Sequence, residues 1–282
     1  MTFFRMNRVS AGLAVLFSLT ALGAHAEGTL KTGVDANYAP HAMRTLGGGI
    51  QGFNIDLGNA LAAQLHEKIE VDGTEFSALI PGLLSKKYDF ILAPVTVTPE
   101  KAKSLLFSEG YLNSDYTFVQ KKDAKPITKL EDLKGMKIAV NKGSSYDVWA
   151  SQNAEKYGFT YDVYGSNADA IQALLAGRAD ANMAGNTVEA WAAKQNPQIK
   201  TTYTITTGLM WSLAFRPDDK AGRDRISMAL KCLKQNGTVV KLAQKWFGFT
   251  PDANSPSVKI VPGQGVPDLP GYDATPVKVV CN

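Results

Sequence analysis

The chain has 282 residues, and 30 Lys or Arg against 26 Asp or Glu give it a formal net charge of +4. So small an excess argues against partners such as nucleic acids or anionic membranes, and no His, Cys and Asp cluster has the spacing of a metal site. The length is enough for one large domain or two modest ones, each with its own core.

The N-terminus has the pattern of a cleaved signal peptide. Two arginines precede a short apolar stretch over 9–23, and Ala24 and Ala26 are the small residues that a signal peptidase recognises. A membrane crossing takes about 20 apolar residues, and no cysteine follows the stretch for lipid attachment. We therefore predict a signal peptide over 1–26 and a soluble mature protein outside the cytoplasm.

Beyond the leader, short apolar runs alternate with helical patterns, which is typical of parallel sheets with crossover helices. A first strand is predicted over 30–34. Asn54 is predicted to cap a helix with leucines at fourfold spacing, and a short second strand follows over 69–71.

The next segment is echoed later in the chain. The segments 78–93 and 169–184 each combine a helical pattern, a turn and an apolar strand that ends in small residues. The matched pairs, all at one offset, are Ile80 and Ile171, Leu83 and Leu174, Leu84 and Leu175, Asp89 and Asp180, and Ala93 and Ala184. Chance similarity between two ordinary α/β units is the weaker alternative. The repeat predicts an α/β protein with two lobes of similar architecture.

The remaining patterns divide the chain between these lobes. A new strand is predicted over 134–140, an apolar run over 211–215, and a helix with one apolar face over 223–233. The predicted division is lobe 1 over 27–119, lobe 2 over 120–210, a return to lobe 1 over 211–248, and a proline-rich extension over 249–282 that wraps lobe 1.

Cys232 and Cys281 are the only cysteines. An even pair in an exported protein is more often a disulfide than two free thiols, so we predict a bond that pins the C-terminal tail to an earlier helix. Two separate buried thiols are the alternative. Catalytic use of either is disfavoured, since His41 and His66, the only histidines beyond the leader, provide no triad partner.

Two loops at predicted strand ends combine a helix start with polar side chains, and ligands bind at such ends of open parallel sheets. In the first loop, Thr98 is a suitable N-cap, Pro99 suits the first helical position, and Lys101 adds a full positive charge. In the second, Ser144 and Ser145 follow a glycine turn. One such loop in each lobe predicts a clamp for a carboxylate. Phosphate is the competing anion, but the second loop lacks the spacing of a nucleotide-binding loop.

Several motifs in order resemble the bacterial periplasmic solute-binding proteins of family 3, the capture subunits of polar amino-acid ABC importers. The motifs are Tyr38-Ala-Pro, Gly52-Phe-Asn-Ile-Asp-Leu57, Phe76-Ser-Ala-Leu-Ile-Pro81, Thr96-Val-Thr-Pro-Glu100, Leu130-Glu-Asp-Leu-Lys-Gly135, Gly177-Arg-Ala-Asp180 and Lys245-Trp-Phe-Gly248. The resemblance covers about 30–248. It implies two α/β lobes, each a mixed or mostly parallel sheet flanked by helices, joined by hinge strands near 117–120 and 209–213. It also implies a monomer that closes over a small solute and delivers it to a membrane permease and its ATPase.

The same resemblance implies which residues bind the solute. Those of lobe 1 are Tyr38, Phe76, Ala93, Thr96 and Lys101, and those of lobe 2 are Ser144, Ser145, Gly185 and Asn186. Trp149 is predicted to pack rather than to bind. No cofactor and no metal are expected.

Two positions depart from the family pattern. The family usually has an arginine at the position of Lys101, whose fork binds a carboxylate through two hydrogen bonds, and an aspartate at Gly185 that pairs with the ligand's ammonium. A bound amino acid would need another partner, such as Asp35, Asn186 or Glu189. We therefore hypothesise an atypical ligand: a modified or conjugated amino acid, or a carboxylate without a free α-ammonium.

Two other function classes are alternatives. A periplasmic enzyme on the same scaffold, similar to cyclohexadienyl dehydratase, would need an acid and a base, and Lys101, Asp35 and Glu189 are candidates although no spacing demands it. A sensor-associated binding module is the third alternative. We predict a binding protein without catalytic residues.

Overall fold

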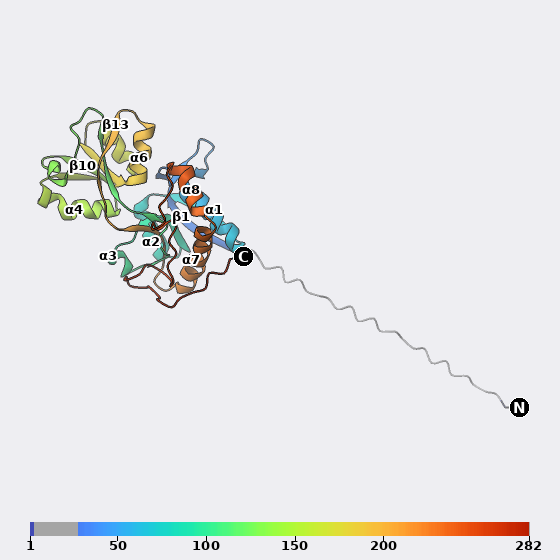
Figure 1. The fold of residues 1–282 in the computed structure, drawn as a ribbon. Helices are drawn as coiled ribbons and strands as arrows, with labels where there is room; N and C mark the ends of the chain where they lie inside the picture. The colour runs from blue at the N-terminus through green and yellow to red at the C-terminus, as the bar shows by residue number, and fades with distance from the viewer. Residues whose placement is uncertain (3–27, 282) are drawn as a thin grey trace.

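The computed structural model describes residues 1–2 and 28–281, so nearly all of the predicted signal peptide lies outside the described residues. Figure 1 shows two lobes side by side: the middle of the chain, in green and yellow, forms one, and the segments before and after it form the other. The predicted two-lobed α/β fold is confirmed.

The first lobe is built on a mixed sheet with strand order β5-β1-β6-β14-β7, and β8 pairs with β14. Its strands are β1 Thr29–Asp35, β5 Lys68–Thr74, β6 Phe90–Thr96, β7 Leu106–Phe107, β8 Leu112–Asn113 and β14 Met210–Phe215. β1 runs parallel to β5 and β6, whereas β14 is antiparallel to its neighbours. A small separate sheet consists of β2 Asn37–Tyr38, β3 Ala42–Arg44 and β4 Ile50–Gln51.

Helices cover this sheet through two apolar clusters. They are α1 Phe53–Leu65, α2 Phe76–Leu84, α3 Pro99–Ala102, α7 Lys220–Gln235 and α8 Thr238–Phe247. Because side chains alternate along a strand, Phe90 and Leu92 join the cluster beneath α1, α7 and α8, whereas Ile91 and Ala93 join the cluster beneath α2. The central strand β6 is therefore buried along its whole length.

The start of α1 differs from the prediction that Asn54 caps it. Gly52 is the N-cap, with φ of 144°, and a Cβ there would collide with the carbonyl of His41. Asn54 lies inside the helix, fully buried, and its amide donates to the Leu92 carbonyl and, at 2.8 Å, to the Tyr111 hydroxyl. Its role is to tie α1 to the sheet rather than to begin the helix.

The second lobe contains a five-stranded sheet in the order β11-β10-β12-β9-β13. Its strands are β9 Tyr116–Lys121, β10 Lys137–Asn141, β11 Thr160–Tyr164, β12 Ala181–Gly185 and β13 Ile199–Ile205, and its helices are α4 Ser145–Tyr157, α5 Asn167–Leu175, α6 Asn186–Gln195 and the 3-10 turn η1 Leu130–Leu133. The three strands β10, β11 and β12 are parallel, and β9 and β13 are antiparallel additions.

The repeat seen in the sequence corresponds to equivalent parts of the two sheets. The order β5-β1-β6 in the first lobe matches β11-β10-β12 in the second. The matched aspartates even make the same bonds: Asp89 accepts from the Lys31 amide at 2.7 Å, and Asp180 accepts from the Lys137 amide at 2.7 Å. Each carboxylate ties the start of its own strand, β6 or β12, to the neighbouring parallel strand, β1 or β10.

The chain crosses between the lobes at two adjacent segments. The first is Ser114 and Asp115, between β8 and β9, and the second is 206–209, between β13 and β14. They are bonded to each other, since Thr207 donates to the Ser114 carbonyl at 2.8 Å and its amide to Asp115 Oδ1 at 3.0 Å. The predicted hinge strand near 117–120, and the lobe boundary at 119, are therefore placed too late, because β9 already belongs to the second sheet.

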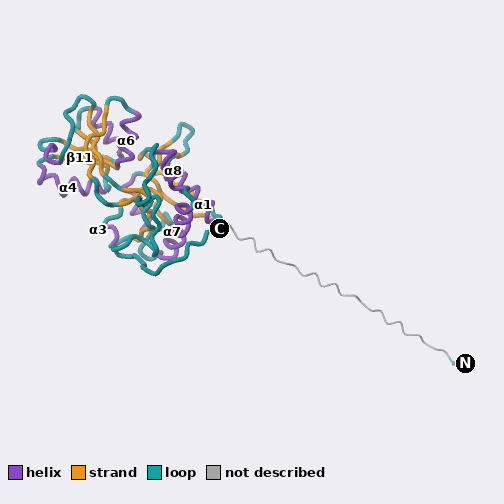
Figure 2. The backbone as a smooth tube through the Cα atoms, in the orientation of Figure 1, coloured by secondary structure: helices purple, strands orange, loops and turns teal. Residues whose placement is uncertain are grey.

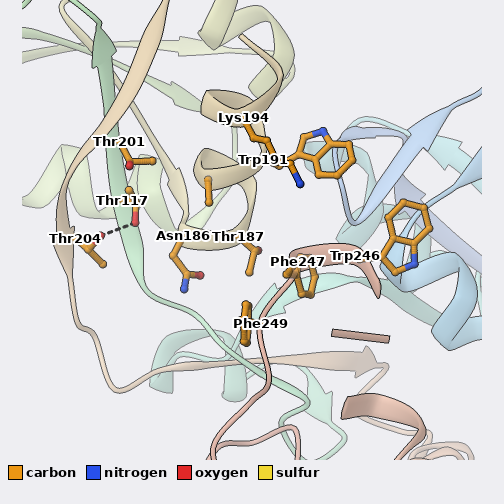
Figure 3. A pocket seen from close by; sticks show the side chains of 11 residues that line it. Thr117, Asn186, Thr187, Trp191, Lys194, Thr201, Thr204, Trp246, Phe247 and Phe249 are labelled. Carbon is orange, nitrogen blue, oxygen red and sulfur yellow. Dashed lines mark hydrogen bonds between the residues drawn. The ribbon is translucent and has the colours of Figure 1, made fainter. Parts of the chain in front are cut away.

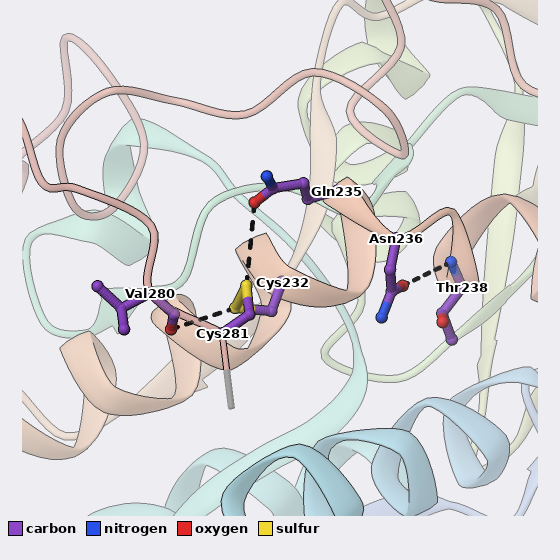
Figure 4. Close-up of a disulfide and its surroundings, with 6 residues drawn as sticks. All are labelled: Cys232, Gln235, Asn236, Thr238, Val280 and Cys281. Atoms are coloured by element: carbon purple, nitrogen blue, oxygen red, sulfur yellow. Dashed lines mark hydrogen bonds between the residues drawn. A yellow bond between two sulfur atoms is a disulfide. The ribbon is translucent and has the colours of Figure 1, made fainter.

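The segment after α8 contains no helix or strand among its described residues, 249–281, and follows the first lobe as a loop (Figure 2). Cys281 bonds to Cys232 of α7 (Figure 4), as predicted from the parity of the cysteines. A buried ion cluster holds the segment as well: Glu109 pairs with Lys231 at 2.5 Å, and Lys231 also donates to the Val261 carbonyl at 2.6 Å.

Candidate functional site

The candidate site is a small cavity between the lobes, at the ends of β1, β6 and β10. Its lining residues are Tyr38, Phe76, Pro94, Thr96, Lys101, Asn141, Ser144, Ser145 and Tyr146. Six of the nine residues predicted to bind solute are among them. The enclosed space measures about 10 Å³, room for one water molecule, so an amino-acid-sized solute requires the lobes to move apart.

Hydroxyl groups from both lobes meet in this cavity. Ser145, the first residue of α4, donates to Thr96 Oγ1 across the cleft at 3.0 Å. Ser144 is the N-cap of α4: its hydroxyl accepts from the Asp147 amide at 3.1 Å and donates to the Asn141 carbonyl at 2.6 Å. Ser144 therefore shapes the helix start, while Ser145 offers its hydroxyl to the first lobe.

Lys101 contributes the positive charge of the cavity. Thr98 caps α3 through the Lys101 amide at 3.3 Å, as the sequence predicts, and this places the Lys101 side chain back over β6. Its ammonium has one hydrogen bond, 3.4 Å long, to the Thr96 carbonyl, and no ion pair among the described residues. Burial lowers the pKa of Lys101 to about 8. A carboxylate in the cavity would supply the missing partner.

Aromatic side chains form the rest of the wall. The Tyr38 and Tyr146 hydroxyls hydrogen-bond across the cleft at 2.8 Å, and the Gly185 amide donates to Tyr38 at 3.3 Å. Burial raises the pKa of both tyrosines, so both phenols stay protonated. The Trp211 indole of β14 donates to Thr96 Oγ1 at 3.1 Å.

Because Gly185 has no side chain, these aromatic residues come close to its backbone. A Cβ at this residue would lie 2.5 Å from Cζ2 of Trp211 and 2.9 Å from the Tyr146 hydroxyl. An aspartate there would force the lobes or the rings apart. The glycine therefore permits the close contact between the lobes, in addition to lacking the carboxylate of an aspartate.

Two buried carboxyl groups lie near the cavity. Asp35, at the end of β1, accepts from the Asn37 amide at 3.0 Å and from Asn141 of the other lobe at 3.4 Å. Burial raises the pKa of Asp35 to about 6, although both bonds oppose the shift. Burial also raises the pKa of Glu189 well above its ordinary value, although the neighbouring Asn167 side chain opposes the shift.

Two predicted residues lie elsewhere. Ala93 faces the core beneath α2, because side chains alternate along β6. Asn186 lines a separate cavity of about 440 Å³, shown in Figure 3, whose walls include Trp191 of α6 and Trp246 of α8. Neither residue belongs to the cavity that contains Lys101. Trp149, predicted to pack, is stacked on Phe159 at 5.9 Å.

The sequence analysis missed Asn141, Tyr146 and Trp211. The first two belong to the same loop and helix start as Ser144, so that loop was the available signal. Trp211 sits within a buried strand, where an aromatic residue has the pattern of core packing.

Comparison with known proteins identifies the class. Residues 30–249 match the family model of bacterial extracellular solute-binding proteins, family 3. The chain belongs to this family.

Particular relatives are similar over most of their length. The arginine-binding extracellular protein ArtP of Bacillus subtilis (strain 168) is 32% identical over 83% of this chain and 94% of that protein. The ABC transporter arginine-binding protein 1 of Escherichia coli (strain K12) is 31% identical over 83% of this chain and 97% of that protein. A solved structure of an ancestral arginine-binding protein bound to arginine has a TM-score of 0.75 and 34% identity, and covers 79% of this chain and all of that one.

Among the described residues, no helix has the length and apolar character that a membrane crossing needs. Within the same residues, no group of three His, Cys, Asp or Glu side chains is arranged to hold a metal ion.

Proposed function

We propose that this protein is the periplasmic capture component of an ABC importer and that it binds a small carboxylate-bearing solute, an amino acid or a derivative, by closing its lobes. The observation that carries the proposal is Lys101. Its ammonium has no acidic partner among the described residues, and Lys101 lines the same cavity as hydroxyl groups contributed by both lobes. The relatives' names, which describe binding of arginine and other amino acids, support the same class of ligand.

The proposal includes its setting. A signal peptide over 1–26 directs the chain to the periplasm, where it works as a monomer and presents its solute to a permease and an ATPase. The proposed binding set is Tyr38, Phe76, Thr96, Lys101 and Ser145, with Ser144 holding the start of α4. Gly185 acts by letting Trp211 approach, and Ala93 and Asn186 are not retained.

Calorimetric titration of the purified protein tests the proposal. Lys101→Met should weaken binding of a carboxylate solute by about 10- to 100-fold, because a charge-assisted hydrogen bond is lost. Lys103→Met is the matched control, since Lys103 is exposed and pairs with Glu100. Equal affinities of the two variants would exclude Lys101 as the carboxylate partner.

An enzyme on this scaffold is the second candidate. One solved structure with a TM-score of 0.69 and 33% identity is an ancestral amino acid-binding protein described as a precursor of cyclohexadienyl dehydratase. Asp35 and Lys101 have pKa values of about 6 and 8, so each can gain or lose a proton near neutral pH. We propose capture without turnover. Release of a chemically altered solute, detected by mass spectrometry after incubation, would favour the enzyme.

A further inference from the structure

The cleft is aromatic where a partner for an ammonium group is expected. Tyr38 and Phe76 line it from the first lobe, Tyr146 lines it from the second, and Trp211 lies against Gly185. A side chain at 185 would therefore meet the Trp211 ring of the first lobe and the Tyr146 hydroxyl of the second.

The polar atoms of these rings are already bonded within the protein. The two tyrosine hydroxyls bond to each other at 2.8 Å, and the Trp211 N–H bonds to Thr96 at 3.1 Å. Phe76 has no polar atom. A primary ammonium carries three N–H donors, and leaving them unpaired in a closed cleft costs affinity. These rings offer it few free acceptors.

A fully methylated ammonium has different needs. It has no N–H to satisfy, its methyl groups pack against rings, and its positive charge is attracted to their faces. Enclosure by several aromatic rings is the known way in which proteins recognise such groups.

Two buried carboxyl groups, Glu189 and Asp35, lie near the rings. Glu189 is fully buried and does not line the cavity. Asp35 lies at the same end of the first lobe, bonded to Asn141. Asp35, with a pKa of about 6, is mostly ionised at neutral pH and favours a cation nearby, whereas the raised pKa of Glu189 favours its neutral form. Lys101 and Ser145 are then available to bind the carboxylate of the solute.

We propose that the preferred solute is a zwitterion in which a carboxylate is combined with a quaternary, N-methylated ammonium, held by Lys101 at one end and by Tyr38, Phe76 and Tyr146 at the other. This inference rests on the proposed capture function and specifies its substrate class.

Five probes of related shape test it by calorimetry. They are trimethylglycine, the trimethylated form of γ-aminobutyrate, their unmethylated parents, and tert-butylacetate, in which carbon replaces the charged nitrogen of trimethylglycine. We expect at least one methylated probe to bind about tenfold more tightly than its unmethylated parent. If trimethylglycine is that probe, its affinity should also exceed that of tert-butylacetate.

Single substitutions test which aromatic residue is responsible for the preference for the methylated probe. Phe76→Leu should reduce the affinity for the methylated probe about tenfold, while Phe76→Tyr, which keeps the ring, should retain it. Phe249→Leu is the control, because Phe249 is an exposed aromatic residue that lines the other cavity.

The outcomes separate the two proposals. Tighter binding of arginine or an unmethylated parent, weakened by Lys101→Met, would overturn the methylated class while leaving capture of carboxylates intact. Equal binding of trimethylglycine and tert-butylacetate would overturn the role of the positive charge. No binding of any carboxylate, with or without Lys101, would remove both proposals.

Discussion

The two lobes share a repeated unit but differ in what they contribute. The first lobe carries the disulfide and a buried ion cluster, in which Glu109 meets Lys231 and Lys234 with all three side chains at most 1% exposed. No comparable ion cluster is present among the described residues of the second lobe. The first lobe also provides the charged groups of the cleft, Lys101 and Asp35, whereas the second provides hydroxyls, amides and a ring. The comparison indicates a braced lobe that holds the charges and a simpler lobe that closes over them.

The largest expected effect concerns the buried ion cluster of the first lobe. Glu109→Gln would leave two buried ammonium groups without a counter-charge, and we expect the free energy of unfolding to fall by about 3–5 kcal/mol. Urea denaturation measures the loss, and hydrogen exchange should place the lost protection in the first lobe.

The control is Glu100→Gln, whose exposed pair with Lys103 is worth less than about 1 kcal/mol. If both variants unfold at the same urea concentration, the ion cluster does not brace the first lobe.

The charge in the cleft should make binding depend on pH. Lys101 has a lowered pKa of about 8, and an anion that binds it raises that pKa again. Affinity for a carboxylate without a titratable amine should therefore be constant below pH 8 and fall up to about tenfold per pH unit above it. Titrations from pH 7 to pH 10 measure this decline.

Lys101→Arg provides the matched comparison, because arginine stays charged over this range and should give a flat profile. A decline of the same size in both proteins would assign it to another group.

The smallest effect concerns the hydroxyl from the second lobe. Ser145→Ala removes the group that reaches Thr96, and affinity should fall about fivefold. Ser151→Ala is the control on the same helix, since that exposed hydroxyl bonds only to the Val148 carbonyl. If the two variants bind the solute with the same affinity, the Ser145 hydroxyl does not contribute to binding, and the second lobe contributes through closure alone.

Much of this architecture was predictable because it follows from local patterns. The periodicity of apolar residues located the repeated units, and Thr98 caps α3 as its sequence predicts. The prediction that Asn54 caps α1 was wrong, and the side chain of Ala93, predicted to bind solute, faces the core. A buried side chain's role depends on which neighbour lies against it, and both residues face β6 or its core rather than solvent or solute.

Short-range order needs only residues within a turn or a strand of one another, which is why capping and alternation were enough for the lobes. The pairing of Cys232 with Cys281, 49 residues apart, was predictable because they are the only two cysteines. Contacts such as Tyr38 with Tyr146, or Trp211 against Gly185, join residues from different lobes. They exist only when the folded lobes meet, because the hinge brings together surfaces that no local pattern relates. The aromatic character of the cleft was therefore decided by the tertiary structure.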